Sequence, residues 1–184
     1  MKKLLLGLAV VAGSFTFAQT FGLKAGLNVS SISHDEMKAK AGFYGGAFVN
    51  IPVAKDFSVQ PEVLYNGAGA KFDDSSDDKI NLSYISVPVM FQYNALPNLY
   101  LEAGPQFSFL IDSKYKGNSV SVDSDDFKGF DFGIGLGAGY YVTKNIGITA
   151  RFVAGLTDVA KKVGNYQLEG KNNVFQIGLA YKFK

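Results

Sequence analysis

Six charged side chains are the residues of this chain that could do chemistry, because each falls on the polar side of an alternating apolar and polar stretch. They are Lys24, Glu62, Glu102, Asp131, Arg151 and Lys182. A pair of carboxylates can act on a glycosidic bond, but only across an open cleft, and a line of charges can form a proton or ion path. Buried charges are otherwise tolerated when they pair and hydrogen-bond. We therefore favour a structural polar network centred on Arg151, with Glu62 and Glu102 within about 6 Å of it.

Glycine fills every second position from 133 to 139, in a stretch that resembles a phosphate-binding loop. That loop follows a strand, opens a helix and has an acidic residue further on, and the flanking sequence provides none of these. A strict period of two is instead typical of a strand, whose side chains alternate between faces. One face then carries apolar side chains and the other carries a glycine ladder, Gly133, Gly135, Gly137 and Gly139.

The remaining candidates for chemistry are weak. His34 is the only histidine, and catalytic triads and zinc sites need a histidine with further partners, so a surface histidine is favoured. The acidic stretches 73–78 and 123–126 could bind calcium, but neither matches a calcium-binding loop. We interpret them as solvated loops, with weak cation or lipopolysaccharide bridging as the alternative. No catalytic residue, metal site or cofactor is predicted.

Residues 1–18 have the pattern of a signal peptide, and 19–184 form one domain. Lys2 and Lys3 precede the apolar residues 4–13, and a small-residue cleavage site predicts cutting after Ala18. Cleavage removes two lysines and leaves a formal charge of zero, so no nucleic-acid partner is expected. The chain has no cysteine, which excludes a disulfide framework. The mature chain also has no apolar run of about 18 residues, so no membrane-spanning helix is expected.

The elements that must position the charges are eight alternating segments, joined by long and short connections in turn. They are predicted at 21–30, 42–51, 57–70, 80–93, 99–111, 129–141, 146–156 and 173–183. Residues 34–41 are expected to form a loop with a turn of helix, and 112–126 a long polar loop. An antiparallel meander that closes on itself has no exposed edge. The sequence therefore predicts an all-β, eight-stranded antiparallel up-and-down barrel.

Prolines fall inside three of these segments. Pro61, Pro88 and Pro105 each lack the amide donor of a strand ladder. We expect β-bulges at these residues, or positions near strand ends.

The apolar face is predicted to point outward. The interior of an eight-stranded barrel is only just wide enough for side chains, and the aromatic face is too bulky for it. A ten-residue strand tilted by about 45° spans roughly 23 Å, close to the ~25 Å apolar band of outer-membrane barrels. Aromatic residues near strand ends suit interfacial girdles: Phe57, Tyr65, Phe91, Tyr93, Tyr140, Tyr181 and Phe183. The barrel is thus predicted to be transmembrane, with short turns periplasmic and long loops outside. Tyr44 and Phe48 then face the lumen, where the glycine ladder leaves room for Arg151 and Tyr44.

Four segments resemble the PorT-like outer-membrane β-barrel proteins, which are related in architecture to the OmpA and OmpX barrels. They are Gly-Leu-Lys-Ala-Gly-Leu-Asn at 22–28, Gln-Pro-Glu-Val-Leu-Tyr at 60–65, Tyr-Leu-Glu-Ala-Gly-Pro at 100–105 and Ala-Arg-Phe at 150–152. The resemblance implies a monomeric barrel in the outer membrane of a Gram-negative cell envelope. Its implied partners are outer-membrane lipid, lipopolysaccharide and the barrel-assembly machinery. That machinery reads a terminal aromatic residue, which here is followed by Lys184. The secretion role associated with the family's namesake is not transferred.

The expected function is a non-enzymatic structural or surface-interaction role, with a side-chain-filled lumen and no open pore. An adhesin or ligand-binding barrel would use Tyr115 and Tyr166, which are expected in loops. A soluble lipocalin-like carrier is a further alternative. An outer-membrane enzyme is disfavoured, because no nucleophile is paired with a histidine.

Overall fold

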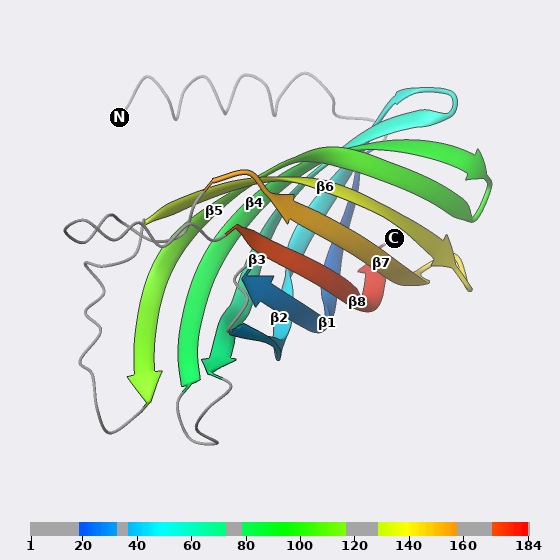
Figure 1. The fold of residues 1–184 in the computed structure, drawn as a ribbon. Coiled ribbons are helices and arrows are strands. Elements are labelled where there is room, and N and C mark those ends of the chain that lie inside the picture. Colours follow the sequence, from blue (N-terminus) through cyan, green and yellow to red (C-terminus); the bar gives the residue numbers. More distant parts are fainter. Residues whose placement is uncertain (1–18, 33–36, 73–78, 117–128, 158–170, 184) are drawn as a thin grey trace, which may run out of the picture.

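Eight antiparallel strands close into one barrel, as the alternation predicts (Figure 1). The computed structural model describes residues 19–32, 37–72, 79–116, 129–157 and 171–183. The strands are β1 (Thr20–Ile32), β2 (Met37–Ala54), β3 (Phe57–Phe72), β4 (Lys79–Leu96), β5 (Leu99–Lys116), β6 (Phe130–Tyr141), β7 (Ile146–Gly155) and β8 (Asn172–Lys182). Each pairs with the next, and β8 returns to pair with β1. No helix in these ranges has the length and apolar character to cross a membrane.

Polar side chains point into the barrel and apolar side chains point out. On β1, Leu23 and Leu27 are exposed while Lys24 and Asn28 are buried. Leu136, between two residues of the glycine ladder, is 67% exposed. This arrangement confirms the predicted orientation and contradicts a lipocalin-like carrier, whose interior would be apolar. The predicted orientation of β2 is also confirmed, since Tyr44 and Phe48 are buried in the lumen.

Of the two alternatives predicted for the three prolines, β-bulges or positions near strand ends, the bulges are not observed. The β3–β4 register is the same at Pro61↔Val89 and at Leu64↔Ser86, and the register also continues unchanged across Pro88 and Pro105. The register shifts lie elsewhere, at Ala39/Tyr44, Pro52/Ala54, Ser83/Tyr84 and Asn94/Leu96. Proline removes one donor from the ladder, whereas a bulge inserts an extra residue, and here the missing donor is accommodated without the insertion.

Five neighbouring strands, β1 to β5, are longer than predicted. β2 already begins at Met37, so the helical turn expected over 34–41 is wrong for its second half. β5 continues to Lys116, which places Tyr115 in a strand opposite Ile80 rather than in a loop. An 18-residue strand is about 59 Å long and rises about 42 Å at a 45° tilt, well beyond a ~25 Å apolar band. Past that band both faces of a strand meet water, so alternation of apolar and polar residues is no longer required there.

Several predictions fall outside the described residues. They concern the signal peptide at 1–18, His34, the acidic stretches 73–78 and 123–126, Tyr166 and Lys184.

Candidate functional site

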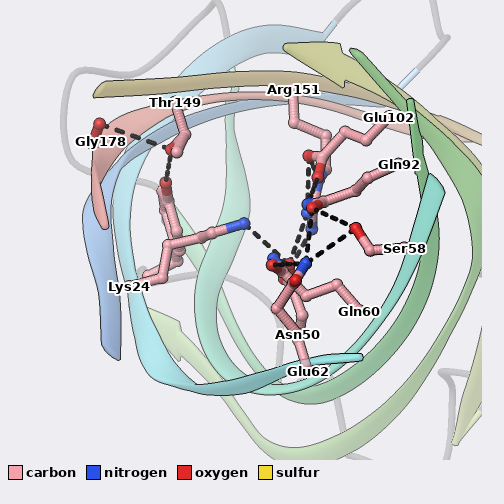
Figure 2. Close-up of polar contacts among 11 residues, drawn as sticks. Lys24, Asn50, Ser58, Gln60, Glu62, Gln92, Glu102, Thr149, Arg151 and Gly178 are labelled. Carbon is pink, nitrogen blue, oxygen red and sulfur yellow. Dashed lines mark hydrogen bonds and ion pairs between the residues drawn. The ribbon is translucent and has the colours of Figure 1, made fainter. Parts of the chain in front are cut away.

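Four of the six predicted charges meet at the centre of the barrel (Figure 2). They come from alternate strands: Lys24 from β1, Glu62 from β3, Glu102 from β5 and Arg151 from β7. We call these four residues the lumen ion cluster. Each side chain reaches inward because its position alternates with lipid-facing neighbours along the strand.

Arg151 holds both carboxylates. Its Nη1 and Nη2 donate to the two carboxylate oxygens of Glu62, at 2.9 and 2.7 Å. Its Nε donates to Glu102 Oε1 at 2.8 Å, and Nη2 lies 2.7 Å from the same oxygen. The planar guanidinium fork suits such paired contacts better than a lysine ammonium does. Arg151 therefore bridges β3, β5 and β7 across the lumen.

Lys24 completes the cluster and balances its charge. Its Nζ donates to Glu62 Oε1 at 2.7 Å. All four side chains are at most 3% exposed, so two cations and two anions share one desolvated site with no net charge. Buried ion pairs are stable only when their remaining donors and acceptors are also satisfied.

Neutral amides supply those further contacts. Gln60 Nε2 donates to Glu62 at 2.8 Å, and Gln92 Nε2 donates to Glu102 at 3.0 Å. Asn50 Nδ2 connects the two glutamines, with contacts of 3.2 Å to Gln60 Oε1 and 2.8 Å to Gln92 Oε1. Figure 2 shows these side chains gathered beside the lumen ion cluster. These amides carry no charge that would mark them in the sequence as members of the site. They could be predicted only from their positions on the polar faces of their strands.

The other two predicted charges lie apart from the cluster. Asp131 is opposite Ser108 on β5, whereas Glu102 is opposite Gly137, a separation of six residues or about 20 Å along the strand. Asp131 instead accepts a hydrogen bond from Thr157 Oγ1 at 2.6 Å. Lys182 lies near the end of β8, where its Nζ is 3.8 Å from the centroid of the Tyr141 ring, the geometry of a cation–π contact.

The glycine ladder lies on the lumen side of β6. A Cβ added to Gly135 would lie 2.7 Å from Met90 Cε and 3.5 Å from Arg151 Cδ. One added to Gly137 would lie 3.1 Å from Glu102 Oε1, and one added to Gly139 would meet the Tyr100 ring. The ladder thus makes room for Arg151, as predicted.

Tyr44 lies close to two glycines outside the ladder. The Tyr44 ring packs over Gly26 of β1 and its hydroxyl over Gly178 of β8. These two glycines are paired with each other in the β1–β8 ladder, so a separate pair of small residues, on another part of the wall, makes the space for Tyr44.

The family model described as "Outer membrane protein beta-barrel domain" matches residues 17–161. The crystal structure of Ail, the attachment invasion locus protein of Yersinia pestis, is similar with a TM-score of 0.53 and 15% identity, covering 91% of this chain and all of that one. Neisserial surface protein A is similar with a TM-score of 0.54 and 14% identity, covering 90% and 97% of the two chains. At such identities the similarity establishes the fold alone. No curated protein matches the sequence.

Proposed function

Because the chain belongs to the outer membrane protein beta-barrel domain family, we propose that it is a non-enzymatic barrel with a closed lumen and a structural or surface-interaction role. The observation that carries this proposal is the lumen ion cluster. It joins β1, β3, β5 and β7 by charged hydrogen bonds across the interior. Such a cross-brace both occupies the lumen and holds opposite walls of the barrel together.

The packing of the lumen argues against a pore. Leu64 and Met90 have no exposed surface, and Tyr44, Phe48 and Tyr100 are also buried inside. Between the lumen ion cluster and the ends of the strands that carry the long connections, the described residues line a cavity of about 20 Å³. That is room for one or two waters, and an eight-stranded barrel is normally filled in this way.

The surface-interaction part of the proposal rests on the long strands. β2, β3, β4 and β5 stay paired up to Met37↔Phe72, Lys71↔Lys79 and Lys79↔Lys116. The lipid-facing apolar series of β5 ends at Ile111, so the paired segments beyond it form a wall past the apolar band. With short turns periplasmic and long connections outside, this wall projects from the cell surface. We further place the chain with the PorT-like barrels, surrounded by lipid and lipopolysaccharide and inserted by the barrel-assembly machinery.

A conductance measurement tests the closed lumen. The chain refolded into planar lipid bilayers should produce no stepwise current across 100 mV, while an open porin in the same bilayer serves as the positive control. Insertion is verified independently by the heat-dependent gel mobility of the same preparation. Discrete, reproducible current steps from correctly folded protein would contradict the proposal.

A further inference from the structure

A small polar cavity lies in the lumen between the lumen ion cluster and the long-connection end of the barrel. Its volume is about 20 Å³, enough for one or two particles the size of a water. On strands that run toward the long connections, its lining residues come after the cluster residues in the chain. Asn28 comes after Lys24 on β1, and Gln106 comes after Glu102 on β5. The cavity is therefore a site separate from the lumen ion cluster.

Three buried oxygens that line this cavity lack a hydrogen-bond partner among the described residues. They are Asn28 Oδ1, the Tyr84 hydroxyl and Gln106 Oε1. These side chains are 1%, 2% and 6% exposed. Asn28 Nδ2 donates to the backbone carbonyl of Phe43 at 3.4 Å, so the end of this amide without a partner is its oxygen. A buried acceptor without a donor is costly, and here several belong to one cavity.

Among the described residues, the charge of the cavity is also unbalanced. Asp131 is the only charged residue among those described as lining it. Within the described ranges, its hydrogen-bond partners are neutral donors: Thr157 Oγ1 at 2.6 Å, the Asn172 side chain and the Phe132 backbone amide. Lys24 and Arg151 are committed to Glu62 and Glu102. A buried carboxylate without a countercharge is expensive.

We infer that this cavity binds one small monovalent cation of the sodium or potassium class. Asp131 supplies the countercharge, and the amide oxygens of Asn28 and Gln106 and the Tyr84 hydroxyl supply neutral ligands. Carbonyl and carboxylate oxygens are the ligands that such hard cations take in place of water. A divalent ion fits less well, since no group of three acidic, histidine or cysteine side chains occurs in the described ranges. An ordered water would satisfy the oxygens but would leave the charge of Asp131 unbalanced.

Thermal unfolding of the full chain in detergent micelles tests the site. At equal ionic strength, sodium or potassium chloride should raise the melting temperature relative to choline chloride, whose cation is too large for the cavity. At ten times the dissociation constant, the expected rise is about 3 °C. Asp131→Asn should abolish this difference. Asp56→Asn is the matched control, because Asp56 is exposed in the short turn between β2 and β3, and it should keep the full difference.

A second variant and a second measurement cover the case in which Asp131→Asn does not fold. Gln106→Met removes one ligand oxygen but keeps the carboxylate, and should weaken cation affinity about tenfold in the same titration. Crystals soaked in a thallium(I) salt should show an anomalous peak beside Asp131. Equal melting temperatures in sodium, potassium and choline chloride, or a cavity that holds water and gives no anomalous peak, would overturn the inference.

Discussion

Replacing Arg151 by methionine removes the centre of the lumen ion cluster while keeping a side chain of similar length. Glu62 would still contact Lys24 at 2.7 Å and Gln60 at 2.8 Å. Glu102 would keep only Gln92, at 3.0 Å. The loss therefore falls mainly on Glu102, a carboxylate that is 2% exposed. Removing one partner from a buried ion pair costs about 3–5 kcal/mol, and we expect Arg151→Met to lower the free energy of unfolding by that amount.

A compensating variant separates the charge effect from simple loss of packing. In Arg151→Met with Glu102→Gln, the uncompensated charge is gone while the Lys24–Glu62 pair remains. We expect the double variant to recover at least about half of the lost stability, because replacing both partners of a buried pair is far less costly than replacing one. Lys144→Met, in the exposed turn between β6 and β7, is the control for loss of one positive charge and should change stability by less than about 0.5 kcal/mol.

The assay is urea unfolding in detergent micelles, followed by circular dichroism and by heat-dependent gel mobility. A loss below about 1 kcal/mol for Arg151→Met, the range of an exposed ion pair, would refute the assignment of a buried brace. A double variant that is less stable than Arg151→Met alone would refute the argument that Glu102 carries the cost.

Three further variants test the packing and pairing of the same lumen. Gly135→Leu should lower stability by about 1–3 kcal/mol through overpacking against Met90, and adding Met90→Ala should restore part of it; unchanged urea midpoints would mean that the ladder faces lipid. Lys24→Met should cost less than Arg151→Met in the same titration, because Glu62 keeps both guanidinium contacts; an equal or larger loss would contradict this ranking. Lys182→Met should cost no more than about 1 kcal/mol, the worth of a cation–π contact outside the cluster, and a loss like that of Arg151→Met would contradict its placement.

The fold could be predicted from the sequence because the bilayer and the narrow lumen impose opposite demands on alternate residues. Leu136 is exposed between the buried Gly135 and the small Gly137, and the same alternation recurs on every strand. The requirement for apolar and polar residues to alternate ends where the apolar band of the bilayer ends. Met37 and Tyr115 lie in strands beyond that limit. Residues 37–41 are mostly good helix formers and residues 112–116 are mostly polar, so neither segment was predicted to be a strand.

The candidate site could be predicted only in part, because a sequence does not contain the strand register. Charge identified Arg151, Glu62 and Glu102 as inward residues, and mid-strand position placed them at similar heights. Lys182 is just as inward by pattern, but Arg151 is opposite Gln176 rather than Lys182 on β8. In a closed barrel, the strand register and the shear determine the position of each inward residue along the barrel axis. The amides of Asn50 and Gln92 carry no charge to single them out, although they complete the hydrogen bonding of the site.

Quenching of a single tryptophan by brominated lipids tests the central claim, an apolar surface in lipid around a closed polar lumen. The chain has no tryptophan. In Leu136→Trp and in Tyr44→Trp, the fluorescence therefore comes from the one tryptophan at the substituted position. Leu136 is 67% exposed on the outer wall and Tyr44 is 3% exposed inside. Lipids brominated along their acyl chains should strongly quench the fluorescence of Leu136→Trp and should quench that of Tyr44→Trp much less. Stronger quenching at residue 44, or no quenching at either residue in folded, lipid-reconstituted protein, would contradict it.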